Sequence, residues 1–178
     1  MEEKTLSSET IFKGHVISLR VDTVIATDGT KKQREIVVHN GAVAMVAVDD
    51  NNNVLLVRQF RTPAGKVLLE IPAGTIEFGD GPDETVPREL QEETGYLPRK
   101  TVKLGAFYSA PGFCTEIIHV YLTTDLKPSR LEADDTKEIE LTRMPVGEVK
   151  KLIDNGTICD AKSIAGILLY MDYLKTHQ

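Results

Sequence analysis

Two neighbouring apolar runs constrain the fold more than any other feature of this sequence. Residues 41–48 contain the uninterrupted run Ala-Val-Ala-Met-Val-Ala-Val, and residues 54–57 read Val-Leu-Leu-Val. The five polar residues 49–53 separate the runs, as expected for a hairpin with a polar tip. Strands without a polar position on either face are typical of sheets that are covered on both sides. The chain is therefore expected to form a layered sandwich around a central sheet.

Helices that could cover this sheet are expected in three places, at residues 85–94, 146–155 and 161–174. Apolar residues recur at helical spacing in the third segment, and Asp160 stands in its N-cap position. Gly156 marks the end of the second segment. Further strands are expected at 68–71, 102–107, 117–122 and 138–141. Strands with helices on both faces indicate a layered sandwich.

The first 40 residues have a different pattern. Ile17, Leu19 and Val21 alternate with polar residues, Asp28-Gly29 indicates a turn, and residues 34–39 supply a return strand. An antiparallel unit of this size is too small to be stable alone. We therefore expect an N-terminal β unit over residues 1–40, packed on the main domain of residues 41–178 or on a second copy of the chain.

Charge and composition exclude several classes of partner. The formal net charge is -6, whereas binding to DNA or RNA requires a basic face. No run approaches the roughly 18 to 20 apolar residues of a membrane span, and the polar start Met1-Glu2-Glu3 does not resemble a signal peptide. We expect a cytoplasmic protein that binds neither nucleic acid nor membrane. Cys114 and Cys159 form no paired pattern and are expected to be free thiols.

An acidic segment carries the chemistry. Glu89, Glu92 and Glu93 are spaced i, i+3 and i+4, so on a helix their carboxylates project from one side and repel one another. A hard cation such as Mg²⁺ takes oxygen ligands and would relieve this repulsion. Taken alone, such a cluster is more often a solvated helix face. The Gly- and Pro-rich loop before it and Gly95 after it favour a binding site.

Residues 74–96, GTIEFGDGPDETVPRELQEETGY, resemble the Nudix box in register over 23 positions. The match includes Gly74, Arg88-Glu89, Glu92-Glu93 and Gly95. Asp80 stands where the pattern has Glu, and Tyr96 where it has an aliphatic residue. Pro87 would cost about 3 kcal/mol inside a helix. We therefore expect the helix to begin near Thr85 or Val86, with Pro87 in its first turn.

Further segments resemble the ADP-ribose pyrophosphatase branch of that family. They are residues 57–61 and 69–74 before the box, residues 109–113 with a proline 16 residues after Gly95, and residues 156–163 in the tail. The resemblance implies an α/β (α+β) fold, a Nudix-type α-β-α sandwich with a mixed central sheet plus the small N-terminal antiparallel β unit. It also implies hydrolysis of the pyrophosphate bond of ADP-ribose to AMP and ribose 5-phosphate. It also implies Mg²⁺ or Mn²⁺ as cofactor and a homodimer formed through the N-terminal strands.

The same resemblance implies roles for individual residues. Metal ligands would be Glu89, Glu92, Glu93 and the backbone carbonyl of Ala73. Arg88 would orient the carboxylates and could also form an i, i+4 ion pair with Glu92. The substrate would contact Arg34, Glu35, Arg61, Glu77 and Gly112.

The general base is expected to be one of two glutamates. In the acidic loop 132–140, Lys137 stands where many relatives carry a mobile glutamate, and a lysine could serve as a base only with a large pKa shift. Glu116 or Glu138 would take the role. Gln33 replaces the arginine usually found two residues before Glu35.

Two alternatives remain open at this point. The substrate could be another nucleoside diphosphate sugar, still a small molecule. Asp80, Pro87 and Lys137 also leave room for a weakly active module that binds ADP-ribose for regulation.

Overall fold

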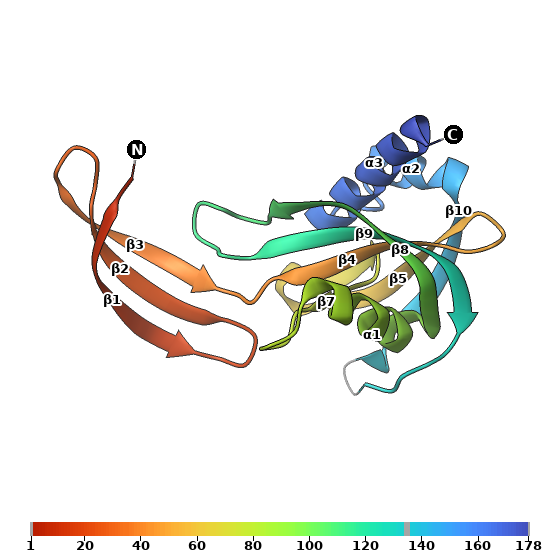
Figure 1. Ribbon diagram of the computed structural model, residues 1–178, viewed down its shortest axis with the longest axis horizontal. Coiled ribbons are helices and arrows are strands. Elements are labelled where there is room, and N and C mark those ends of the chain that lie inside the picture. Colours follow the sequence, from red (N-terminus) through yellow and green to blue (C-terminus); the bar gives the residue numbers. More distant parts are fainter. Residues whose placement is uncertain (1, 134–135, 178) are drawn as a thin grey trace. The chain divides into compact units, whose positions relative to one another are not determined.

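A computed structural model describes residues 2–133 and 136–177 (Figure 1). The chain divides into two compact units. The smaller unit contains residues up to 41 together with 108–117, and the larger unit contains residues 42–107 and 118 onward.

The larger unit is built on a mixed sheet in which the main strand order is β10-β5-β4-β9-β8. β4 runs parallel to β9 and antiparallel to β5, while β6 pairs with β5 and β7 with β4. The strands are β4 (Ala42–Val48), β5 (Asn53–Arg61), β6 (Lys66–Glu70), β7 (Ala73–Thr75), β8 (Tyr96–Tyr108), β9 (Ile117–Pro128) and β10 (Glu140–Pro145). A short 3-10 helix, η1 (Thr62–Ala64), connects β5 to β6. The mixed central sheet expected from the sequence is confirmed.

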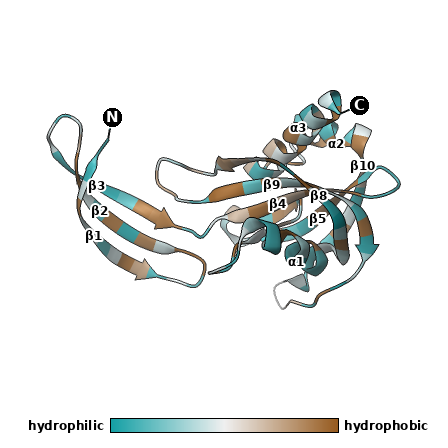
Figure 2. Cartoon of the chain, in the orientation of Figure 1, coloured by the Kyte–Doolittle hydropathy of each residue, from teal (hydrophilic) through white to brown (hydrophobic). Residues whose placement is uncertain are grey.

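Helices cover both faces of this sheet. α1 (Pro82–Thr94) lies on one face, and α2 (Val146–Asp154) and α3 (Ala161–Thr176) lie on the other (Figure 1). Alternate residues of β4 point to opposite layers: Val43 and Met45 share a core with Leu90 of α1, whereas Val46 shares one with Ile167 of α3. All five side chains are fully buried, and hydrophobic residues mark β4 and β9 between the helices (Figure 2). The predicted α-β-α sandwich is therefore confirmed.

The hairpin between β4 and β5 also has the expected polar tip. Oδ1 of Asp49 accepts hydrogen bonds from the amides of Asn51 and Asn53, at 3.0 and 2.9 Å. Asn52 adopts the left-handed conformation, with φ 59°, which Asn tolerates better than most residues. Backbone amides of the tip are therefore hydrogen-bonded locally, and the two apolar strands can pair antiparallel.

The two C-terminal helices begin and end close to their predicted bounds. Oδ1 of Asp160 accepts the amide hydrogen of Ser163 at 3.1 Å, which confirms its N-cap role at α3. Gly156, with φ 77°, follows the end of α2. No helix in the described ranges 2–133 and 136–177 has both the length and the apolar character needed to cross a membrane.

The predicted start of α1 is wrong. The helix begins at Pro82, and Pro87 lies inside it. The earlier start has local causes: Pro82 occupies the first turn, where a missing amide hydrogen costs little, and the Glu84 carboxylate accepts the Gly81 amide hydrogen at 2.7 Å. Asp83 and Glu84 also place negative charge at the positive end of the helix dipole.

The smaller unit is an antiparallel sheet of three strands in the order β1-β2-β3. These strands are β1 (Lys4–Lys13), β2 (Ser18–Ile25) and β3 (Lys31–Val38). The two strands predicted in this region correspond to β2 and β3, whereas β1 was not predicted. Within the same unit, the bridge between Val37 and Cys114 joins segment 108–117 to β3. Both cysteines, Cys114 and Cys159, are free, as expected.

Candidate active site

The acidic face of α1 lies against the short strand β7. Glu89 and Glu93 are only 9% and 7% exposed, although both are charged residue types. A Cβ atom on Gly74 would lie 1.9 Å from Cδ of Glu89, so the Glu89 side chain occupies the space that any other residue at position 74 would fill. Oε2 of Glu93 accepts the amide hydrogen of Ala73 at 3.0 Å. Two carboxylates are thus held directly on the backbone of residues 73–74.

The electrostatic state of Glu93 sets this site apart. Burial raises its pKa to about 8, and the nearby charge of Glu89 acts in the same direction. The hydrogen bond from the Ala73 amide opposes both effects without cancelling them. The site therefore contains a carboxylate whose negative charge the protein compensates incompletely, and a cation beside it would favour the ionised form.

Arg88 supplies part of the positive charge expected beside the cluster. Its Nη1 lies 2.8 Å from Oε1 of Glu89 and 3.5 Å from Oε2 of Glu92, so the predicted i, i+4 contact with Glu92 is present. The same nitrogen lies 3.5 Å from Oε1 of Glu77. Arg88 therefore connects three carboxylates and fixes the directions in which they point.

The carboxylates do not form a complete metal cage by themselves. Within residues 2–133 and 136–177, no group of three or more Asp, Glu, His or Cys side chains is gathered closely enough to hold a metal ion. Arg88 holds Glu89 and Glu92, while Glu93 faces the Ala73 amide. The donor set is nevertheless all oxygen, which fits Mg²⁺ or Mn²⁺ when substrate phosphates and water complete the coordination. Metal ligation by Glu89, Glu92, Glu93 and the Ala73 carbonyl stays a prediction.

Arg61 makes a contact that the sequence did not predict. Its Nε and Nη2 donate to Oε1 and Oε2 of Glu70 at 3.0 and 2.7 Å. Lys162 also donates to Oε2 of Glu70, whose side chain is 1% exposed. Burial would raise the pKa of Glu70, but the hydrogen bonds from Arg61 and Lys162 outweigh burial and lower it. In the sequence, the one sign of this contact was the acidic residue Glu70 within the apolar run Leu68-Leu69-Glu70-Ile71, which indicates a buried carboxylate in need of a partner.

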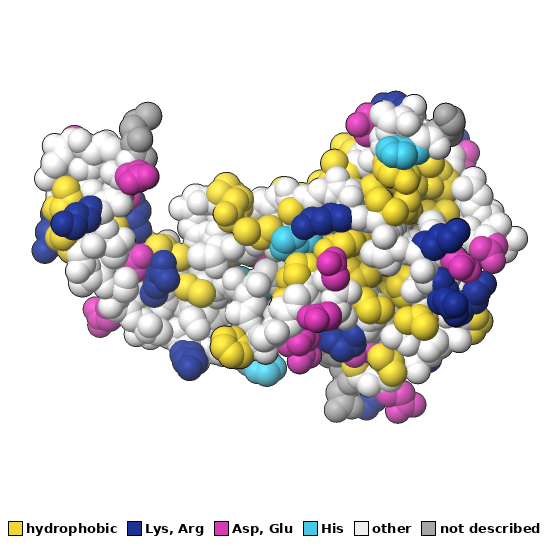
Figure 3. Space-filling view, in the orientation of Figure 1, with side chains coloured by type: hydrophobic (Ala, Val, Ile, Leu, Met, Phe, Trp, Pro, Cys, Tyr) yellow, Lys and Arg dark blue, Asp and Glu magenta, His cyan; other side chains and the backbone are white. Residues whose placement is uncertain are grey.

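Two other predicted residues of the larger unit are exposed. The side chain of Glu77 is 69% exposed and lies near Arg88. Figure 3 shows acidic side chains beside a basic one on the surface over β7 and α1. Glu138 and Lys137 are exposed as well, in the acidic loop 132–140, of which residues 134 and 135 lie outside the described part of the chain. The role of Glu138 as a base stays a prediction.

The remaining predicted residues belong to the smaller unit. Nε of Arg34 donates to Glu3 at 3.0 Å, and Glu35 is exposed. A Cβ on Gly112 would meet nothing within 4 Å. Oε1 of Glu116 lies 3.7 Å from Nδ1 of His39, and the same nitrogen accepts the Gly41 amide hydrogen at 3.0 Å. The predicted role of Glu116 is untested.

Comparison with known proteins gives independent findings. A model of the NUDIX domain matches residues 38–165, and a model of the nucleoside diphosphate sugar hydrolase N-terminal domain matches residues 3–37. An ADP-ribose pyrophosphatase of Bacillus subtilis (strain 168) is 42% identical over 169 residues, which cover 94% of this chain and 91% of that protein. A methanol dehydrogenase activator of Bacillus methanolicus is 39% identical over 168 residues, covering 93% and 91%.

The fold is also found in a solved structure. The crystal structure of an ADP compounds hydrolase superposes with a TM-score of 0.90, covering 99% of this chain and 96% of that chain, at 22% identity. At this level of identity, the likeness supports the fold alone.

Proposed function

The chain belongs to the Nudix family of hydrolases, and from that premise we propose that it cleaves ADP-ribose to AMP and ribose 5-phosphate with the help of Mg²⁺ or Mn²⁺. The observation that carries the proposal is the pair of buried carboxylates, Glu89 and Glu93, packed on the backbone of residues 73–74. A cytoplasmic homodimer belongs to the same proposal.

The reaction adds water across the pyrophosphate. A water oxygen attacks one of the two phosphorus atoms, the bond from that phosphorus to the bridging oxygen breaks, and two phosphate monoesters leave. The proton lost by water passes to a base, for which Glu116 and Glu138 are the candidates. A bound divalent ion would neutralise phosphate charge and make the attacking water more acidic.

The chain's own residues would divide this work. Glu89, Glu92, Glu93 and the Ala73 carbonyl would hold the ion together with the substrate phosphates. Arg88 keeps the carboxylates oriented through its contacts with Glu89 and Glu92. Arg61, whose side chain is 38% exposed, would place a fixed positive charge beside the phosphates and bind them in the ground state and the transition state alike.

Glu93→Gln tests the proposal most directly. The amide keeps the side chain's size but cannot carry the negative charge that a cation requires, so we expect kcat to fall by at least about 100-fold. AMP and ribose 5-phosphate are measured by chromatography after incubation of purified protein with ADP-ribose and Mg²⁺. Glu148→Gln is the control, because Glu148 is exposed on α2, where it pairs with Lys151. Full activity of Glu93→Gln would refute the assigned role.

A panel of substrates decides which nucleoside diphosphate sugar is preferred. ADP-ribose, ADP-glucose and GDP-mannose share the pyrophosphate but differ in base and sugar. The family model over residues 3–37 supports nucleoside diphosphate sugars as a class and does not rank them. We expect the highest kcat/KM with ADP-ribose, and a higher value for a different member would correct the substrate while retaining the enzyme class.

A regulatory role is the second candidate. One relative is named a methanol dehydrogenase activator, and Asp80, Pro87 and Lys137 depart from the expected pattern in this chain. A regulator of this kind would bind ADP-ribose saturably and release no AMP. Calorimetric titration of ADP-ribose in the presence of Mg²⁺, run beside the hydrolysis assay, separates the two functions.

A further inference from the structure

A largely buried polar cluster joins β5, β6 and the start of α3. Glu70 lies at its centre, where the Arg61 guanidinium forms a two-pronged contact with both carboxylate oxygens. Lys162 donates to Glu70 and, at 2.9 Å, to Oδ1 of Asp160, the N-cap residue of α3. The cluster thus alternates in charge from Arg61 through Glu70 and Lys162 to Asp160.

Packing does not explain a carboxylate at position 70. The neighbouring residues Leu69 and Ile71 are buried and apolar, and removing an ionised carboxylate from water costs several kcal/mol before its partners compensate. A hydrophobic residue of similar volume often stabilises such a site equally well. The ion pair therefore points to a role besides the stability of the fold.

The geometry of Arg61 indicates what this contribution is. A paired contact through Nε and Nη2 fixes both the position and the plane of the guanidinium, whereas a single hydrogen bond would leave it free to rotate. The Glu70 hydrogen bonds are the main cause that raises the pKa of Arg61, and the charge of Glu93 adds to them. The charge of Arg61 therefore interacts with the Glu93 carboxylate of α1.

We infer that Glu70 is a positioning residue, which holds the Arg61 guanidinium in a fixed orientation toward the phosphates of the nucleotide substrate. This inference rests on the proposed function, because it assigns Arg61 to the phosphates. Lys162 has a supporting role: it balances the buried charge of Glu70, so that the carboxylate stays ionised and can accept from Arg61 at both oxygens.

Glu70→Gln is the first test. Glutamine has the same shape, but its amide group presents only one acceptor oxygen, so Arg61 loses one prong of its contact. We expect KM for ADP-ribose to rise about tenfold while kcat changes less than about threefold, since a mobile Arg61 weakens substrate and transition-state binding alike. Glu70→Asp is the second variant: it keeps the buried charge, shortens the reach by one methylene, and should raise KM by a smaller factor.

A double-mutant cycle shows whether Glu70 acts through Arg61. In an Arg61→Ala background, Glu70→Gln should leave KM unchanged within about twofold, because the residue that it positions is already absent. If Glu70→Gln raises KM about tenfold in that background as well, then Glu70 acts elsewhere and the inference is overturned.

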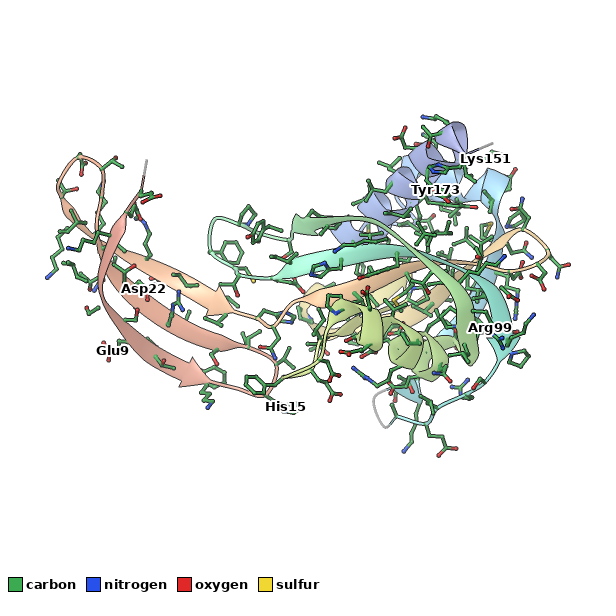
Figure 4. The ribbon with its side chains drawn as sticks, viewed as in Figure 1. Glu9, His15, Asp22, Arg99, Lys151 and Tyr173 are labelled. Atoms are coloured by element: carbon green, nitrogen blue, oxygen red, sulfur yellow. The ribbon has the colours of Figure 1, made fainter. Side chains whose placement is uncertain are left out.

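Matched controls separate positioning from loss of stability. Ser163 is fully buried beside the cluster, and its Oγ accepts the Ile71 amide hydrogen at 2.9 Å. Ser163→Ala removes a buried hydrogen bond and should lower the Tm without changing KM. Lys162→Met removes the charge that balances Glu70, so it should weaken the Arg61–Glu70 contact and raise KM, whereas its control Lys151→Met on the surface of α2 (Figure 4) should leave KM unchanged.

A measurement independent of turnover completes the design. Phenylglyoxal modifies accessible arginines, and the modification of Arg61 can be followed by mass spectrometry of its peptide. We expect slow modification of Arg61 in the wild-type protein and in Ser163→Ala. In Glu70→Gln, Arg61 loses a hydrogen bond, and we expect its modification to be at least about threefold faster. If the wild-type protein hydrolyses no nucleotide sugar, the proposed function fails while this rate still reports on Arg61. An unchanged rate in both Glu70 variants overturns the inference.

Discussion

Gly74 lies where the backbone of β7 contacts Glu89, a predicted metal ligand. In Gly74→Ala, the new Cβ would lie 1.9 Å from Cδ of Glu89, and the carboxylate would have to swing away from the backbone. Because a side chain moves more easily than a strand, we expect the fold to survive with a loss of about 1–2 kcal/mol while kcat falls about 100-fold or more. Urea unfolding and the AMP assay measure the two effects separately.

Gly147→Ala is the matched control for this substitution. Gly147 lies on α2, and its Cβ would meet nothing within 4 Å, so alanine should stabilise the helix by up to about 1 kcal/mol and leave kcat unchanged. Unchanged kcat in Gly74→Ala would mean that the position of Glu89 on the backbone is not needed for the reaction.

Glu70 gives a pH dependence with a defined sign. Its pKa lies below the ordinary value of 4.5 in the folded protein, because the hydrogen bonds from Arg61 and Lys162 outweigh the effect of burial. Between the folded and unfolded pKa values, the unfolded chain binds more protons, so the stabilisation is complete above about pH 5 and is lost as the pH falls further. Glu70→Gln should therefore have a lower free energy of unfolding than the wild-type protein at pH 7, and this difference should become smaller below pH 4.5.

Urea unfolding of both proteins across this pH range measures the difference. Glu140→Gln is the control, because the Glu140 side chain is 79% exposed and its Oε2 lies 4.0 Å from Nε of Arg58, so its charge is screened by water. A difference that stays constant down to the acid limit of folding would show that Glu70 is not ionised in the native protein.

For individual residues, the sequence could predict which side chains lie together only where they are close to one another in the chain. Glu89 and Glu93 lie in one short helical segment, so their common face followed from helix geometry. Glu70 and Lys162 are 92 residues apart, and no local pattern connects them. The partner of Arg61 therefore became visible only in the folded chain.

Among the elements, α1 contains a residue that destabilises it, Pro87. Pro87 lies inside the helix, where it cannot donate to the carbonyl of Asp83, and its ring crowds that carbonyl. We expect Pro87→Ala to raise the free energy of unfolding by about 1–3 kcal/mol. Urea unfolding checks the gain. If the variant is less stable, then the proline does more in the fold than interrupt the helix.

The activity of Pro87→Ala bears on how rigid the acidic face must be. Glu89 and Glu93 already rest on the backbone of residues 73–74, so their positions do not depend on a bend at Pro87. We therefore expect kcat to change less than about twofold, since the groups that act in the transition state keep their places.

The predicted elements succeeded where burial left a strong pattern in the sequence. β4 and β5 are apolar on both faces because helices cover both, and α3 shows helical spacing because one side faces the sheet. β1 is exposed along its whole length, so no periodic apolar signal marks it. The start of α1 was misplaced because capping by Gly81 and Glu84 outweighed the cost of an internal proline.

At the scale of the whole molecule, the described part of the smaller unit buries few apolar side chains, Val24 and Ala26 among them. Every residue of β1 is exposed, and Leu6, Ile11 and Phe12 are 50%, 54% and 55% exposed. An edge strand with apolar side chains in water is prone to associate. A sheet of three strands becomes stable when a second surface covers it, and a second copy of the chain would supply one.

We therefore expect a homodimer formed through the β1–β3 sheet, with a mass near twice 19.7 kDa in sedimentation velocity at micromolar protein concentration. Phe12→Asp places a charge on the exposed apolar strand and should shift the protein toward monomer, because an unpaired charge in an interface is costly to desolvate. Leu168→Asp is the matched control: Leu168 is 45% exposed on α3, outside this sheet, and its replacement should leave the dimer intact. A wild-type monomer, or a dimer disrupted equally by both substitutions, would mean that the chain associates through a different surface or not at all.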